Sequence, residues 1–141
     1  MQIQRIQSVY LLLAAIAMAV FMFLPVIGLI NDNTELSVGA LNTCGVTNAM
    51  PLMLCLDVLI VVLSLITLFK YRDLSFQMKL CKVNVMLIVT LLIIIGITAY
   101  LQKGCVQWTI ALPIIALVLV MLAHKGIKHD KKLLSDSERI R

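Results

Sequence analysis

Four long apolar runs, separated by shorter polar or charged segments, dominate the pattern of this chain. They cover residues 8–30, 50–69, 83–101 and 108–123. About 20 helical residues cross a hydrocarbon core of ~30 Å, because each residue of an α-helix rises ~1.5 Å. The pattern therefore predicts four transmembrane helices, which make residues 1–124 one membrane domain.

The first run is too long for a cleaved signal peptide. No charged residue occurs between Arg5 and Asp32, and apolar residues fill most of this interval. The apolar core of a signal peptide is only ~7–15 residues long. We therefore expect an uncleaved helix over residues 8–30, with Pro25 and Gly28 placed to kink its last third.

The segments between the runs differ in charge. Residues 31–49 are rich in Asn, Thr and Gly and contain no Lys or Arg, so we expect an outer loop with a short extended piece around residues 36–41. Residues 102–107 are expected to form a tight outer turn. The connector, residues 69–84, is basic, and its part 74–82 is either an interfacial helix or an extension of the third span.

The tail, residues 125–141, is also basic. On a helix, Ile127 and Leu134 would share one face, and Leu133 and Ile140 another. Neither stripe is wide enough to demand a partner. The tail is therefore expected to be a solvated or membrane-surface helix, with a docking peptide for another protein as the alternative.

The Lys and Arg residues predict the orientation of the chain. The N-terminus, the connector and the tail hold one, four and six of them, and the two outer loops hold only Lys103. Positive residues beside membrane spans stay in the cytoplasm, which places both termini and the connector there. Short connections then favour an all-α, up-down bundle of four helices. The basic residues of the connector are Lys70, Arg72, Lys79 and Lys82.

The composition excludes an ordinary soluble domain. Hydrophobic residues make up 62% of the chain and charged residues 13%, against about 45–50% and 25% in soluble domains. The net charge of +5 does not indicate nucleic-acid binding, because the basic residues flank apolar runs and form no stripe with interleaved aromatics. Anionic lipid headgroups at the cytoplasmic face are the expected partner.

The predicted topology places two of the four cysteines, Cys44 and Cys105, in the two outer loops. Disulfides persist outside the cytoplasm. A bridge between them would close a loop of about 60 residues and stabilise the fold by roughly 4 kcal/mol. Two free thiols are the alternative. The remaining cysteines, Cys55 and Cys81, belong to the second span and to the inner end of the third.

The cysteines also raise the hypothesis of a membrane thiol oxidoreductase. Such enzymes need a close pair such as C-x-x-C, and this sequence contains none. No Cys/His group has the spacing of metal ligands, and His124 and His129 are expected to be solvated in the basic tail. We therefore predict no catalytic residue, no metal and no cofactor.

Asp57 is the only charged residue within the four predicted spans. An acid at the bilayer centre costs about 2.5–3.5 kcal/mol, and the apolar residues of the second span offset that cost. Ser64 and Thr67 follow seven and ten residues later, so the three side chains form one stripe. A polar stripe of this kind is expected to face protein rather than lipid.

Three interpretations of Asp57 remain open. It is a neutral acid hydrogen-bonded inside the protein, a proton or cation site lining a cavity, or an acid that reaches the outer interface. Counted inward from the outer surface, Pro25, Thr98 and Pro113 share its depth. Each proline leaves a carbonyl four residues earlier without its helical donor, and a protonated Asp57 could donate to the carbonyl of Phe21 or Thr109.

Four stretches of the chain have a distinctive sequence, namely IQRIQSVYLLLAAI (residues 3–16), Ala40-Leu41, LCKVN (residues 80–84) and KKLLSDSERIR (residues 131–141). Through these stretches the chain resembles a known bacterial family of small four-span membrane proteins, the domain of unknown function 4293. The resemblance covers nearly the whole chain and implies four spans and a bacterial inner membrane, but no activity. Asp57, Cys44 and Cys105 are not part of the family pattern.

The leading functional hypothesis is a non-enzymatic membrane protein that acts through protein contacts, as a scaffold, subunit or assembly factor. The alternative is a small proton-coupled transporter that resembles four-span multidrug exporters and uses Asp57, with Ser64 and Thr67 beside it. Those exporters carry their acid in the first span, whereas Asp57 is in the second. Both hypotheses allow a homo-oligomer.

Overall fold

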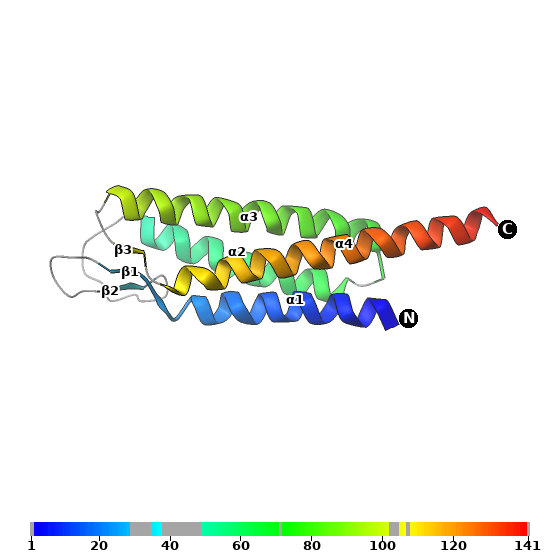
Figure 1. The fold of residues 1–141 in the computed structure, drawn as a ribbon, viewed down its shortest axis with the longest axis horizontal. Coiled ribbons are helices and arrows are strands. Elements are labelled where there is room, and N and C mark those ends of the chain that lie inside the picture. The colour runs from blue at the N-terminus through cyan, green and yellow to red at the C-terminus, as the bar shows by residue number, and fades with distance from the viewer. Residues whose placement is uncertain are drawn as a thin grey trace.

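A computed structural model describes residues 2–28, 35–37, 49–70, 72–101, 105–106 and 108–140 of the chain. Four helices lie side by side and run alternately up and down, with both termini at the same end (Figure 1). Helix α1 packs against α2 and α4, and α3 packs against the same two helices. The helices are α1 (Gln2–Phe21), α2 (Ala49–Phe69), α3 (Leu74–Leu101) and α4 (Ala111–Arg139), with the short 3-10 helix η1 (Trp108–Ile110) before α4.

A small antiparallel sheet lies at the end of the bundle opposite the termini (Figure 1). Its central strand comes directly after α1, and its two edge strands come from the segments before α2 and before α4. The expected all-α fold is therefore confirmed in its four helices, and this sheet is added to it. The strands, in the order β2-β1-β3, are β1 (Pro25–Gly28), β2 (Glu35–Ser37) and β3 (Cys105–Val106).

The buried positions of every helix alternate in steps of three and four residues. On α2, for example, they run from Met53 to Thr67 with this spacing. Steps of three and four keep one seam of a helix facing its neighbours, as in coiled coils and four-helix bundles. The seams are Gln7, Leu11, Ala14, Met18 and Phe21 on α1; Met53, Asp57, Ile60, Ser64 and Thr67 on α2; Gln77, Cys81, Asn84, Ile88, Leu91, Ile95 and Thr98 on α3; and Pro113, Ala116, Val120, Ala123, Ile127 and Asp130 on α4.

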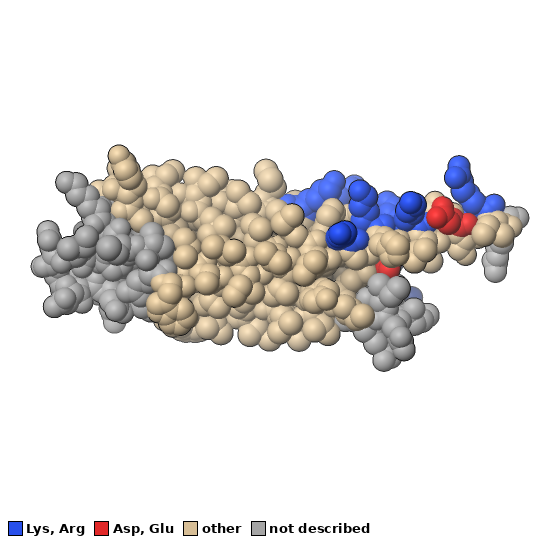
Figure 2. Space-filling model, viewed as in Figure 1, with Lys and Arg blue, Asp and Glu red and all other residues tan. Residues whose placement is uncertain are grey.

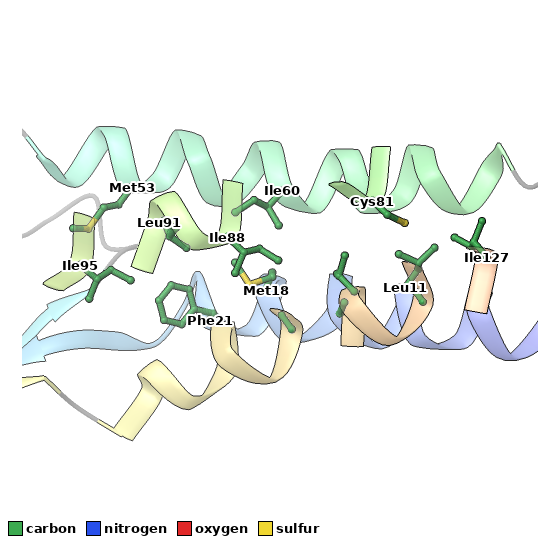
Figure 3. Close-up of a cluster of buried hydrophobic side chains, with 14 of the residues drawn as sticks. Leu11, Met18, Phe21, Met53, Ile60, Cys81, Ile88, Leu91, Ile95 and Ile127 are labelled. Atoms are coloured by element: carbon green, nitrogen blue, oxygen red, sulfur yellow. The ribbon is translucent and has the colours of Figure 1, made fainter. Parts of the chain in front are cut away.

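These seams meet in layers across the bundle. In the core, Ile60, Ile88 and Met18 point toward one another from α2, α3 and α1 (Figure 3). Closer to the sheet, Leu91 and Phe21 point into the same part of the core (Figure 3). The interior is thus a stack of side-chain layers, each supplied by several helices.

The outside of the bundle is apolar, as expected for a protein in lipid. Large hydrophobic side chains are exposed along all four helices, which a soluble monomer rarely shows. Three helices are long and apolar enough to cross a membrane, namely α2, α3 and α4. The apolar part of α1 whose side chains the structure describes, Ile6–Phe21, is shorter. These features indicate a membrane protein.

Charge gathers at the end of the bundle where α4 projects, and the described middle of the face seen in Figure 2 carries no Lys, Arg, Asp or Glu. Among the described side chains, Asp57 is the only charged residue outside the connector, the start of α3 and the second half of α4. The basic connector residues Lys70, Arg72, Lys79 and Lys82 are all exposed at this end. In addition, Lys70 Nζ lies 5.7 Å from the centre of the Phe76 ring.

The first helix is shorter than predicted, because α1 ends at Phe21 rather than continuing to residue 30. Pro25 has no amide hydrogen and disfavours helical backbone in the residue before it. The last turn therefore tightens, and the amide of Leu24 donates to the carbonyl of Phe21 at 3.1 Å. Pro25 then opens strand β1, a position where proline is tolerated in sheets.

The connector and the tail are continuous with their neighbouring helices. Residues 74–82 extend the third span, so this alternative is the correct one, and α3 begins at Leu74. Helix α4 runs without a break across residue 124 to Arg139. Pro113, expected inside the fourth span, lies in the first turn of α4, where its missing amide hydrogen costs nothing. The expected extended piece at 36–41 overlaps β2 only at its start.

Candidate polar site inside the bundle

Polar side chains occupy several positions of the helix seams. On α2 these are the three predicted residues, Asp57, Ser64 and Thr67, whose exposed fractions are 0%, 1% and 0%. Because a bundle interior has a low dielectric, each such group needs a hydrogen-bond partner or imposes a cost. The other buried polar residues are Gln7, Gln77, Asn84, Thr98, Thr109 and Asp130.

Asp57 is buried without a partner among the described residues. Neither of its carboxylate oxygens accepts or donates a hydrogen bond there. Ser64 on α2 contacts Asn84 on the antiparallel α3. Asp57 comes seven residues before Ser64, and Leu91 comes seven residues after Asn84, so Asp57 and Leu91 lie at the same level of the bundle. Leu91 and Phe21 fill the same part of the core (Figure 3). The acid therefore lies at the level of an apolar layer.

Two partners expected for Asp57 are not where the sequence placed them. Thr98 lies seven residues beyond Leu91, about 10 Å closer to the sheet, and its hydroxyl donates to the carbonyl of Ile94 at 2.7 Å. The carbonyl of Phe21 already accepts the amide of Leu24. Equal depth was inferred by counting inward from the predicted outer end of each span, and α1 ends at Phe21, before the predicted end of the first span.

A buried hydrogen bond joins α2 and α3 near the middle of the bundle. The side-chain amide of Asn84 donates to the hydroxyl of Ser64 at 2.7 Å, and both residues are buried. The oxygen Asn84 Oδ1 has no partner among the described residues. Thr67, one turn away, donates instead to the carbonyl of Leu63 at 2.6 Å. The prediction of a polar stripe on α2 did not include Asn84, the residue of α3 that donates a hydrogen bond to Ser64.

A second buried contact joins the start of α1 to the second half of α4. The amide nitrogen of Gln7 donates to the carboxylate of Asp130 at 2.5 Å, across 123 residues of sequence. Gly126 lies one turn before Asp130, and a Cβ at this position would come within 3.1 Å of Gln7 Cγ and Nε2. Because glycine has no side chain, Gln7 can pack against Gly126 and reach Asp130. Sequence reasoning missed this cluster, although all three residues lie in polar segments flanking spans.

The remaining predicted groups are separate from these contacts. His124, expected to be solvated, has a buried Nδ1 without a hydrogen-bond partner among the described residues, while His129 is exposed. Cys55 is exposed and Cys81 buried, both as free thiols. No group of three possible metal ligands occurs among the described residues. The side chains of Cys44 and Cys105, and hence the predicted disulfide, lie outside the described residues.

A known protein family matches nearly the whole chain, including all four helices. The profile of a domain of unknown function, DUF4293, matches residues 3–140. The chain belongs to this family. The DUF4293 match includes the Ser64–Asn84 and Gln7–Asp130 contacts. No curated protein and no solved structure matches the chain. Membership in DUF4293, a domain of unknown function, assigns no activity.

Proposed function

We propose that the chain is a non-enzymatic, multi-pass protein of the bacterial inner membrane, with both termini in the cytoplasm, that acts through protein contacts as a scaffold, subunit or assembly factor. The observation that carries this proposal is the projection of α4 beyond the other helices (Figure 1). Residues 131–140 are all exposed. The basic residues at the same end support the cytoplasmic orientation.

The projecting part of α4 offers apolar anchors outside the bundle. Ile127, grouped with Leu134 in the sequence pattern, is buried in the core, whereas Leu133 and Leu134 are 49% and 53% exposed. Ile140 lies on the same side of the helix as Leu133 and is 88% exposed. Lys131 and Lys132 precede these anchors. The tail therefore fits the groove of a partner that is apolar at its centre and acidic at its rim.

Removing the apolar anchors of the tail is expected to release the protein from its native complex. The double variant Leu133→Ala/Leu134→Ala keeps a good helix former at both positions. Extracted from native membranes in mild detergent, the wild type is expected to migrate as a complex larger than one chain on native electrophoresis. The double variant is expected to migrate at a smaller mass.

The matched control is Ser135→Ala/Ser137→Ala, which truncates two exposed polar side chains of the same helix. It should leave the mass of the complex unchanged. A wild type that migrates as a single chain, or a control that releases the complex as fully as the leucine variant, would contradict the scaffold proposal.

A second candidate function, a small proton-coupled transporter, is favoured by Asp57. A carboxyl inside a membrane helix bundle, with no partner among the described residues, is a candidate proton site. A transporter must bring water to this acid, and a scaffold need not.

The test for the transporter is an Asp57→Cys variant in a chain whose four native cysteines are changed to Ser or Ala. Its reaction with a membrane-impermeant maleimide is measured from each side of sealed vesicles. If Asp57 lines a water-filled path, labelling is expected to be fast from at least one side. Absence of labelling in a folded variant would remove this candidate and leave the scaffold proposal intact. The native cysteines are Cys44, Cys55, Cys81 and Cys105.

A further inference from the structure

A groove of about 740 Å³ runs between α3 and α4 at the basic end of the bundle. One part of its lining is apolar and includes Val85 and Met86 from α3 and Val118 and Met121 from α4. The other part is basic and also comes from both helices. Its three lysines are Lys82, Lys125 and Lys128.

The three lysines line the same groove from two neighbouring helices. Lys82 lies on α3, while Lys125 and Lys128 are one turn apart on α4. No acidic residue is among the described residues that line the groove. The nearest acid along α4, Asp130, is buried and bound to Gln7. The positive charge of the groove is therefore not neutralised from within the described part of the protein.

The apolar part of the groove lies farther from the termini than the basic part. Since α3 and α4 run antiparallel, Met86 and Val118 both lie toward the sheet relative to the lysines. Their side chains are 69% and 49% exposed, on the outer surface that faces lipid. A ligand that fills the whole groove must be anionic at one end and apolar along the rest.

We infer that this groove binds one anionic phospholipid, with the headgroup phosphate among Lys82, Lys125 and Lys128 and an acyl chain along the apolar residues of α3 and α4. A phospholipid in the leaflet at the basic end of the bundle has this polarity and this direction. Basic pockets between membrane helices recognise anionic headgroups in the same way. The site is independent of the tail anchors Leu133 and Leu134, so it stands apart from the scaffold proposal.

The test measures thermal unfolding of the full chain in detergent with added dioleoyl-phosphatidylglycerol or dioleoyl-phosphatidylcholine. We expect the anionic lipid to raise the unfolding midpoint saturably, and the zwitterionic lipid to have little effect. Changing Lys82, Lys125 and Lys128 to Gln should weaken the apparent affinity for the anionic lipid by about a hundredfold, since each lysine near an anionic lipid surface contributes roughly a fivefold factor.

The control variant removes the same charge from the connector, by changing Lys70, Arg72 and Lys79 to Gln. These residues are exposed and do not line the groove. The control should retain most of the affinity. An equal loss in both triple variants would overturn the site, because it would show a diffuse response to surface charge.

A second variant, Val118→Phe, narrows the apolar part and leaves every lysine in place. It should also lower the affinity for the anionic lipid, and an unchanged affinity would overturn the proposed acyl-chain contact. Soluble glycerol 3-phosphate serves as a headgroup without chains. Should it stabilise the protein as strongly as the lipid, the groove would be a phosphate site and not a lipid site.

Discussion

Replacing Asp57 with leucine is expected to stabilise the protein by about 3 kcal/mol, because an unpaired acid inside a membrane helix bundle costs about that much. Asp57 is fully buried, and neither carboxylate oxygen has a hydrogen-bond partner among the described residues. Leucine is apolar and matches the neighbouring layer of Leu91 and Phe21. The free energy of unfolding in mixed detergent micelles measures the effect.

The control for this prediction is Asp57→Asn, which removes the charge but keeps a polar group in the same place. It should change the stability much less than leucine does, since a buried amide without partners still imposes a cost. If the leucine variant is less stable than the wild type, then Asp57 has a partner or a water-filled path that stabilises its polar form. A gain in stability from removing this acid would fit a functional role for Asp57, because functional groups are commonly kept at the expense of stability.

The two described glycines within helices α3 and α4 are expected to respond to alanine in opposite directions. Gly126→Ala places a Cβ within 3.1 Å of Gln7 and disturbs its hydrogen bond to Asp130. Losing a hydrogen bond to a buried charged group costs about 1.5–3 kcal/mol. A Cβ added at Gly96 would meet no atom within 4 Å. Gly96→Ala should therefore gain up to about 1 kcal/mol of helix propensity.

This pair of variants separates packing from helix propensity, since the substitution is identical and both sites are helical. The unfolding midpoint of the two single variants, measured in one detergent, is sufficient. Stabilisation by Gly126→Ala would mean that Gln7 moves aside at no cost and that its contact with Asp130 contributes little. In the double variant Gln7→Ala/Gly126→Ala, the glycine change should cause no additional loss of stability, because the Gln7 side chain that the added Cβ would contact is absent.

The four helices were predictable because length and apolar character decide them. The inward face of each helix was harder, since the spans are apolar all round and offer little periodic contrast. Isolated polar residues mark the face instead. Asp57, Ser64 and Thr67 share one stripe, and the structure buries all three. Asn84 stands alone among apolar neighbours in the same way, and its position on the seam of α3 follows once the three-and-four spacing is known.

Pairings between helices could not be predicted from the sequence. Whether Asp57 is level with Thr98 or with Leu91 depends on the register of α2 against α3, which the Ser64–Asn84 contact shows. The end of α1 was also not predicted, since it lies at Phe21, nine residues before the predicted end of the first span. The contact between Gln7 and Asp130 requires the antiparallel register of α1 and α4 together with a glycine gap at residue 126. The sheet depends on tertiary pairing of three short segments, such as Ile27 with Val106. Of these segments, the sequence indicated an extended piece only near β2.

The continuity of α4 has a mechanical consequence. Its 29 residues form a rod of about 43 Å, of which one end lies beside the small sheet and the other stands clear of the bundle (Figure 1). A flexible linker would absorb a force applied to the tip, whereas an unbroken helix transmits it along its axis. Near the point where α4 leaves the bundle, the hydrogen bond from Gln7 to Asp130 joins α4 to α1. A force applied to the tip of α4 would therefore reach both helices and the side-chain layers between them.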